Sequence, residues 1–399
     1  MMKRPHVLVI NSKTLLPNID GATIRSLQMI RMLAGTCDVD VVYTCQRSLQ
    51  PKDLSPLYAY CKHVTGFTTS TIAMIVRGCL GLFSRKPLQC AYFYSPEAQR
   101  YIDSHLSEYD FVFCNNVRAA QYVVGQECNK VIDYVDALSM RFRKEIDNVG
   151  LIKRLVFRIE YKRLTEYEVK IYREFQGHFI ISDIDRQYIL RHAGTTCKEI
   201  HVINNSTELR PAVQTNDKQN LVFVGSMYYD PNIVAVTTFV HHSFPRIKAA
   251  VPGATFYIVG TRPSRAVREL AADSVVVTGF VDDPQAYLRD ATVVVVPMIS
   301  GAGVQNKILE AMSMGCCVVT TDIGSEGLDD VVSGRDIIIC HDYEDIADVV
   351  IDLIADKQRR AEIGRNARNY ISGHLTYEII EKQFTNCLQQ VIKQEKTNH

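Results

Sequence analysis

A glycine loop after Pro297 leads into a lysine and a glutamate one helical turn apart, and these residue types suit a phosphorylated sugar. Gly301 and Gly303 allow the backbone to turn sharply and to approach a ligand closely. The letters NKILEAMSM that follow predict a helix, whose first N–H groups and positive dipole end favour an anion. Lys307 adds a positive charge in the first turn, and Glu310 shares its face. A phosphate on the lysine and a sugar hydroxyl on the carboxylate would make a nucleotide-sugar site. The alternative is an ordinary strand-loop-helix crossover with a solvated Lys307–Glu310 pair, because glycine loops are common at strand ends.

A second loop with similar chemistry lies near the N-terminus. A strand predicted over His6–Asn11 runs into a turn that ends at Gly21, and a helix is predicted over Thr23–Leu33. Gly21 would let the backbone approach a donor diphosphate, and Arg25 could pair with phosphate oxygens. The alternative is a plain turn with an exposed Arg25.

Short β-branched runs alternate with helical stretches along the whole chain, which predicts an α/β fold with parallel sheets. The predicted strands are His6–Asn11, Val39–Cys45, His63–Phe67, Phe111–Asn115, Lys130–Val135, His178–Ser182, His201–Asn204, Leu221–Gly225, Thr255–Gly260, Val275–Phe280, Thr292–Pro297, Cys316–Thr321 and Ile337–Cys340. Thirteen strands are too many for one such sheet, so we expect two doubly wound, Rossmann-like domains.

A polar, proline-containing stretch, NNSTELRPAVQTNDKQN, marks the boundary between the two predicted domains. We expect a first domain at 1–205, a linker at 206–219, a second domain at 220–375, and a C-terminal helix at 376–399 that packs back on the first domain. Ligands of open α/β sheets bind outside the carboxyl ends of the strands. The sequence therefore predicts a cleft between two such sets of strand ends, which closes on the donor.

The charge of the 399-residue chain is unevenly distributed, although its net charge is only +1. Residues 1–210 contain 28 Lys and Arg against 21 Asp and Glu, and the remainder is acidic. Two stretches in the first half, Thr71–Lys86 and Met140–Phe175, combine basic and apolar residues. They predict either interfacial elements on an anionic membrane or helices with an ordinary solvated face. Met140–Phe175 in particular is expected to be one long amphipathic helical segment.

The remaining composition is that of a globular protein of the cytoplasm. Hydrophobic residues make up 47% and charged residues 22%, and no apolar run reaches the roughly 18 residues needed to span a bilayer. The twelve cysteines form no CxxC pair, which favours reduced thiols over disulfides or a zinc site. The apolar run at the N-terminus is too short for a signal peptide.

With both loops identified, the chain resembles retaining glycosyltransferases of the GT-B fold, specifically the family-4 group that builds bacterial surface polysaccharides. The matching segments are FVGSMYYDPN, FYIVGTRP, VVVTGFVDDPQAYLRDATVVVVP and GAGVQNKILEAMSMGCCVVTTDIGSEGL. The resemblance implies that the second domain holds a nucleotide sugar and the first holds a glycan or lipid-linked glycan acceptor. It implies that Glu310 binds the ribose and that residues 279–281 border the base. The candidate donor-binding residues are Gly21, Gly225, Arg262, Gly279, Phe280, Val281, Gly301, Ala302, Gly303, Val304, Lys307 and Glu310.

The sequence departs from the family pattern at two places. Position 302 is alanine, so Glu310 alone remains of the Glu-x7-Glu pair, and Ser226 stands where relatives carry a cation for the diphosphate. Lys307, Arg25 or Arg262 would then have to supply that charge. Strand ends here lack the histidine that relatives often have, so Asp136 is the best candidate for the polar group at the acceptor hydroxyl. Its alternative role is the N-cap of a helix over 137–144. Asp136, Lys307 and Arg25 form the candidate catalytic set.

Three further classes of protein have to be weighed against this function. A metal-dependent, single-domain transferase would use an Asp-x-Asp, but Asp38–Asp40 and Asp183–Asp185 look like turn and cap residues, so no metal site is expected. A nucleotide-sugar epimerase of the same fold and a catalytically degenerate subunit of a polysaccharide assembly complex are also consistent with the sequence. The favoured function is metal-independent, retaining transfer of a hexose from a UDP- or GDP-linked donor, with no further cofactor and no nucleic-acid partner. The expected location is the cytoplasm, on the inner face of the cell membrane.

Overall fold

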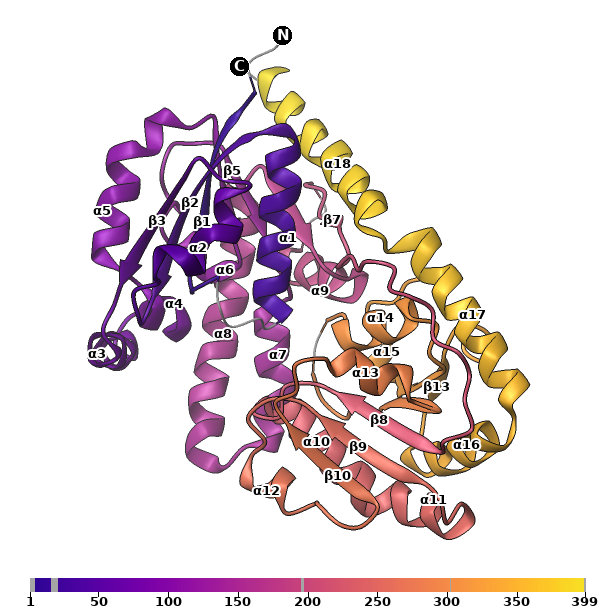
Figure 1. Ribbon diagram of the computed structural model, residues 1–399. Helices are drawn as coiled ribbons and strands as arrows, with labels where there is room; N and C mark the ends of the chain where they lie inside the picture. Colours follow the sequence, from indigo (N-terminus) through magenta and orange to yellow (C-terminus); the bar gives the residue numbers. More distant parts are fainter. Residues whose placement is uncertain (1–3, 16–20, 195–196, 302, 398–399) are drawn as a thin grey trace. The chain divides into compact units, whose positions relative to one another are not determined.

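The chain divides into two units, each built on a parallel β-sheet (Figure 1). The first unit comprises Met1–Asn204 and Glu381–His399, and the second comprises Asn205–Ile380. The computed structural model describes residues 4–15, 21–194, 197–301 and 303–397. Residues 205–219, which precede the first strand of the second sheet, contain neither helix nor strand.

The first unit contains a seven-stranded sheet within the described residues, in the order β3-β2-β1-β4-β5-β6-β7, and every neighbouring pair is parallel. The strand order reverses direction between β1 and β4, which is the place where doubly wound sheets bind ligands. The strands are β1 His6–Asn11, β2 Asp38–Cys45, β3 His63–Thr68, β4 Phe111–Asn115, β5 Lys130–Asp133, β6 Gly177–Ile180 and β7 His201–Val202.

The second unit contains a six-stranded parallel sheet within its described residues, in the order β10-β9-β8-β11-β12-β13, and it reverses between β8 and β11. The strands are β8 Asn220–Val224, β9 Thr255–Val259, β10 Val275–Gly279, β11 Val293–Val296, β12 Val318–Thr321 and β13 Ile338–Cys340. The α/β fold of two Rossmann-like sheets is therefore confirmed.

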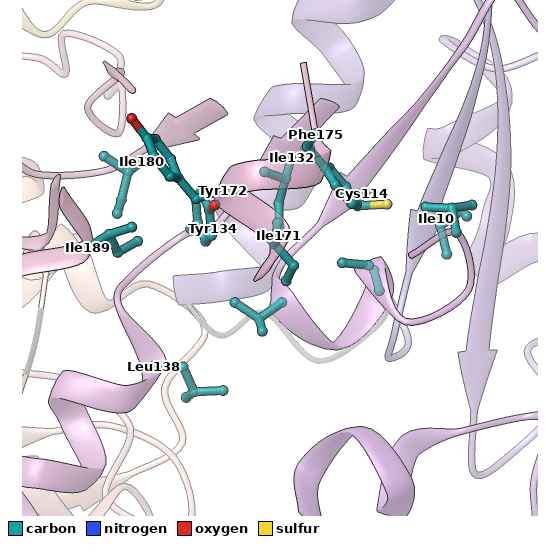
Figure 2. Close-up of a cluster of buried hydrophobic side chains, with 14 of the residues drawn as sticks. Ile10, Cys114, Ile132, Tyr134, Leu138, Ile171, Tyr172, Phe175, Ile180 and Ile189 are labelled. Atoms are coloured by element: carbon teal, nitrogen blue, oxygen red, sulfur yellow. The ribbon is translucent and has the colours of Figure 1, made fainter. Parts of the chain in front are cut away.

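Strand β11 shows why the pattern of the sequence was informative. All four of its valines are buried, as expected for a central parallel strand that is covered on both faces. In the first unit, strand residues Ile10, Cys114 and Ile132 pack in one hydrophobic cluster with side chains of helix α8 such as Ile171 and with Phe175 just beyond that helix (Figure 2). Each sheet thus has its own core.

Helices flank both sheets, and no helix among the described residues is both long and apolar enough to cross a membrane. The helices of the first unit are α1 Gly21–Thr36, α2 Pro51–Tyr58, α3 Thr71–Gly81, α4 Leu88–Phe93, α5 Pro96–His105, α6 Val117–Ala120, α7 Leu138–Glu145, α8 Leu151–Glu174 and α9 Asp183–Ala193. The helices after β8 along the chain are α10 Asp230–Thr238, α11 Phe244–Ala250, α12 Arg265–Arg268, α13 Pro284–Arg289, α14 Asn306–Ser313, α15 Asp322–Ser325, α16 Tyr343–Ala355, α17 Lys357–His374 and α18 Tyr377–Thr397.

The segment expected to be one long helix, Met140–Phe175, is instead two helices. Helix α7 ends at Glu145, a single 3-10 turn covers Ile146–Asn148, and α8 starts after Gly150. Asp, Asn and Gly favour turns over helix interiors, and the letters DNVG between the two helices supply all three.

Helix α18 crosses the boundary between the units, because the first unit resumes at Glu381. The ring of Phe384 is fully buried in the first unit, with its centroid 5.0 Å from that of Phe179 and 6.2 Å from that of Phe113. The last helix therefore supplies core residues to the unit that the chain begins with.

Candidate active site

The candidate donor site lies where the strand order of the second sheet reverses. Strands β8 and β11 are neighbours there, and their carboxyl ends lead into the loops that begin at Gly225 and Pro297. The loops after β8 and β9 are joined by their backbones, since Met227 N–H donates to Thr261 O at 3.0 Å. A Cβ atom at Gly260 would lie 1.6 Å from Gly225 O, so this close approach requires glycine at position 260. The two loops form one fixed edge of the site.

The loop after β11 is also held by neighbouring strands and helices. The hydroxyl of Tyr343 donates to Pro297 O, and Thr321 Oγ1 donates to Met298 O at 2.6 Å. Further along, Gly301 and Gly303 have φ angles of +131° and +69°, in the region that other residues rarely adopt. Val304 is buried, and Ala302 lies outside the described residues.

Helix α14 begins directly after this loop with an open N-terminus. Its N-cap residue, Gln305, makes no side-chain cap hydrogen bond in the described structure. The first N–H groups of a helix carry a partial positive charge and need acceptors. An anion seated in the glycine loop would supply them.

Lys307 provides a full positive charge in the first turn of α14. Its Nζ donates to Gln305 Oε1 at 2.8 Å and lies 5.5 Å from the ring centroid of Phe223. Among the described residues it has no carboxylate within ion-pair distance, so the alternative of a Lys307–Glu310 pair is wrong. Burial lowers the pKa of Lys307 to about 7, because desolvation disfavours the charged form. A bound phosphate would restore the charge.

Glu310 lies one turn further along α14 and is held from the side by α13. Its Oε1 accepts a hydrogen bond from Gln285 Nε2 at 3.1 Å. Gln285 comes four residues after Val281, in the helix that follows the loop at the end of β10. In that loop Gly279 has a φ of +70°, and Phe280 is 72% exposed. Glu310 therefore lies beside the helix that leads away from the residues assigned to the base.

Arg262 occupies the other edge of the candidate site, in the loop after β9. It has a φ of +53°, which is uncommon for a long side chain and costs conformational energy. Its guanidinium lies 5.7 Å from the ring centroid of Tyr228, on the loop after β8. Arg262 is exposed. It remains a predicted diphosphate ligand.

The prediction that Arg25 binds phosphate is wrong. Arg25 lies in α1 and is 1% exposed. Its Nε and Nη2 donate to the two carboxylate oxygens of the fully buried Asp133, at 2.7 and 2.8 Å, and its Nη1 donates to Ile203 O at 2.7 Å. The guanidinium is thereby committed to the end of β5 and to the backbone after β7. Gly21, the first residue of α1, is exposed, and its assignment to the donor diphosphate remains a prediction.

Asp136 is half-buried just before α7, but it is not the N-cap of that helix. The N-cap is Ala137, and two other carboxylates accept hydrogen bonds from backbone N–H groups at the start of the helix. Asp185 Oδ1 accepts from Ala137 N at 2.9 Å, and Glu168 Oε1 accepts from Ser139 N at 3.1 Å. The alternative role of Asp136 as a cap is therefore wrong, and its assignment to the acceptor hydroxyl stays a prediction.

The two capping carboxylates are unusual because both are buried. Desolvation, opposed by hydrogen bonds from Ser139, raises the pKa of Glu168 to about 8. Desolvation, reinforced by the charge of Asp136, raises the pKa of Asp185 to about 6. Folding therefore takes up protons at these sites near neutral pH.

A pH-dependent stability follows from Glu168. Its pKa is higher in the folded than in the unfolded protein, so its contribution should be lost as pH rises from about 5 to about 8. Glu168→Gln keeps the acceptor for Ser139 N–H and removes the titration. We expect the urea midpoint of the variant to vary less over this range and to exceed that of the wild type at the alkaline end. Equal pH profiles for the two proteins would contradict the assignment.

Two asparagines were missed by reasoning from the sequence. Asn11 and Asn115 are paired in register at the ends of β1 and β4, where the first sheet reverses. Both are buried. Asn11 Oδ1 and both polar atoms of the Asn115 amide lack a hydrogen-bond partner among the described residues. The sequence pattern that could have identified them is an asparagine at the end of an apolar run, as in FVFCN.

The two Asp-x-Asp segments serve other purposes. Asp38 pairs with Lys62 at 2.6 Å, and Asp40 lies 3.1 Å from ring nitrogens of His6 and His63. Asp183 and Asp185 lie in the first turn of α9. Within the part of the chain that the structure describes, no group of three or more His, Cys, Asp or Glu side chains could hold a metal ion.

The chain matches known proteins both in part and over its whole length. Residues 218–356 match the family "Glycosyl transferases group 1", and these residues include the candidate donor site. A 44.6 kDa protein in the cps region of Klebsiella pneumoniae is 23% identical over 383 residues, which cover 92% of this chain and 95% of that protein.

Two solved structures share the fold of the whole chain. Sucrose-phosphate synthase of Thermosynechococcus elongatus superimposes with a TM-score of 0.71 at 15% identity, over 97% of this chain and 99% of that one. HepE of Anabaena, in complex with UDP and glucose, gives a TM-score of 0.66 at 16% identity, over 96% and 100% of the chains. The two-sheet architecture is thus that of the GT-B fold.

Proposed function

We propose that this chain, which is a glycosyltransferase of the GT-B fold, moves a hexose-type sugar from a nucleotide sugar to a glycan or lipid-linked glycan. The observation that carries the proposal is the cationic site at the start of α14. There a half-buried lysine with no carboxylate partner among the described residues, an open helix N-terminus and two glycines at positive φ meet in one loop. Each of these three features favours a diphosphate.

The second unit binds the donor in this proposal. Lys307 and the N–H groups of α14 hold the diphosphate, Glu310 accepts a hydrogen bond from a ribose hydroxyl, and Arg262 adds charge at the other edge. During transfer, the bond between the anomeric carbon and the diphosphate oxygen breaks, and a bond to the acceptor oxygen forms on the same face of the sugar. Negative charge grows on the leaving diphosphate, and fixed positive charge lowers the barrier. The proton of the acceptor hydroxyl leaves with the nucleoside diphosphate.

The first unit binds the acceptor in this proposal, at the carboxyl ends of its strands. Asp136 accepts a hydrogen bond from the acceptor hydroxyl and orients it. HepE binds UDP and glucose, and the Klebsiella relative lies in a cps region, which supports a nucleotide-linked donor and a role in surface polysaccharide synthesis. We propose that transfer needs no metal ion and that it takes place in the cytoplasm, on the anionic inner face of the membrane.

Replacing Glu310 tests the donor site most directly. Glu310→Ala should leave the protein folded and weaken binding of the nucleotide sugar about 10- to 100-fold, because a charge-assisted hydrogen bond to the ribose is lost. Isothermal calorimetry with UDP and GDP sugars, followed by a transfer assay in excess chelator, measures both steps.

Gln285→Ala is the matched control, since it removes the neighbour of Glu310 and keeps the carboxylate. We expect a smaller effect on donor affinity from this variant. Unchanged affinity and turnover in Glu310→Ala would remove Glu310 from the site. Donor binding without any transfer or hydrolysis would favour a degenerate subunit, and interconversion of the free nucleotide sugar would favour an epimerase.

A further inference from the structure

Helix α3 presents most of its large apolar residues to solvent and its glycines to the protein. Phe83, just beyond its C-terminus, is 91% exposed, and Ile72 and Leu80 are 76% and 64% exposed. These three positions, together with Ile75 and Val76, recur at the spacing of one helical face. A helix on the surface of a globular protein normally does the reverse, so this face indicates a partner.

The protein-facing side of α3 explains how the helix stays in place without burying that face. Gly78 and Gly81 allow close packing on α4, because a Cβ at these positions would lie 3.3 Å from Tyr92 and 2.9 Å from Ala91. Met74 is the buried large side chain of α3. The exposed apolar residues are therefore not needed to hold α3 on its own unit.

Polar contacts fix both ends of this segment. Ser70 caps α3 at its N-terminus, and Arg77 donates to Tyr94 O at 2.5 Å. Arg163 of α8 donates to Gly81 O at 2.8 Å and to Leu82 O at 2.9 Å. The exposed face is thus presented on a fixed helix.

The charge around α3 identifies the kind of partner. Residues 54–96 contain no Asp or Glu, and the exposed Arg85 and Lys86 directly follow the apolar face. The first turn of α8 repeats the combination, with exposed Leu151 and Ile152 next to Lys153. Apolar residues flanked by cations fit an anionic lipid surface, and around α3 no acidic residue lies nearby in the sequence.

We propose that the apolar face of α3 inserts into the interfacial region of an anionic bilayer, and that Arg85 and Lys86 lie at the headgroups. The inference rests on the proposed membrane location and deepens it, since it replaces attachment by charge alone with apolar insertion. Attachment should then persist in part at high salt, because salt screens the charges and does not weaken apolar burial.

Vesicle co-sedimentation of the full-length protein tests this inference. On phosphatidylglycerol–phosphatidylcholine vesicles, Leu80→Ser/Phe83→Ser should bind at least about 100-fold more weakly than the wild type at low and at high salt. Arg85→Gln/Lys86→Gln should bind the vesicles about fivefold more weakly per removed charge at low salt, and almost as tightly as the wild type at high salt. The matched control is Val234→Ser/Val332→Ser, which alters exposed apolar residues of the second unit and should bind like the wild type.

The outcomes separate the inference from the proposed function. Wild-type binding by Leu80→Ser/Phe83→Ser, or complete release of the wild type by salt, would overturn insertion by α3. Self-association of the wild type without vesicles, abolished by the same substitution, would overturn it in favour of a second copy. Donor affinity, measured in parallel by calorimetry, tests the proposed transferase function and should be unchanged in every variant of this set.

Discussion

Lys307→Ala is expected to lower turnover about 100- to 1,000-fold while weakening donor binding less. The reason is that the charge on the leaving diphosphate is greatest in the transition state, so a fixed cation stabilises that state more than the bound donor. Lys307 carries the positive charge in the first turn of α14, beside the open N-terminus of that helix. Steady-state transfer kinetics and calorimetric donor binding, compared for the same preparations, separate the two effects.

The pH dependence of Lys307 provides a signature that a structural role would not produce. Because its pKa in the free protein is lowered to about 7, the fraction of protonated lysine falls above that pH. We therefore expect kcat/KM for the donor to decline about tenfold per pH unit on the alkaline side. Lys307→Arg should shift this decline to higher pH, since a guanidinium stays charged.

A variant of similar shape controls for packing at this position. Lys307→Met keeps an unbranched apolar chain beside Phe223 and removes only the charge. It should be as inactive as the alanine variant and as stable as the wild type. Full activity in Lys307→Met would show that the charge is not used.

Arg25→Met is expected to destabilise the first unit by about 3–5 kcal/mol, because it leaves the buried carboxylate of Asp133 without its partner. Asp133→Leu should destabilise the first unit by a similar amount, because it leaves the buried guanidinium of Arg25 without its carboxylate partner. Combining the two substitutions should restore much of the loss, since neither charge remains. Urea denaturation, with hydrogen exchange of amides in α1 and β5 to locate the effect, measures this coupling.

This result would also distinguish the two roles considered for Arg25. Loss of a phosphate ligand would lower donor affinity and leave stability unchanged. Loss of a structural pair lowers stability and leaves the affinity of the folded fraction unchanged. Weaker donor binding by a fully stable Arg25→Met would show that Arg25 binds phosphate after all.

Backbone architecture could be predicted because it depends on local pattern. Runs such as VVVV in β11 are informative by themselves, since only a strand buried on both faces favours so many β-branched residues in succession. The main error in the predicted backbone concerned one turn, because Met140–Phe175 was expected to be a single helical segment. The turn residues from Asp147 to Gly150 separate α7 from α8, although they lie within an otherwise continuous helical pattern.

Side-chain partnerships could not be predicted in the same way. Arg25 and Asp133 are 108 residues apart, and nothing in the spacing of either residue indicates the other. The capping of α7 is similar, because Glu168 and Asp185 reach it from two different helices. By contrast, the residues of the donor loop are contiguous in sequence. A glycine loop, a lysine and a glutamate that follow one another directly could therefore be recognised together.

The burial of Phe384 among the aromatic side chains of the first unit has a consequence for how the protein is made. The first 204 residues leave the ribosome long before the segment that completes their core. During translation of the second unit, the surface that Phe384 covers on Phe113 and Phe179 must stay exposed to solvent or be held by a chaperone. A chain that stops before Glu381 would lack this cover permanently. The unit whose synthesis begins first is therefore the last to complete its core.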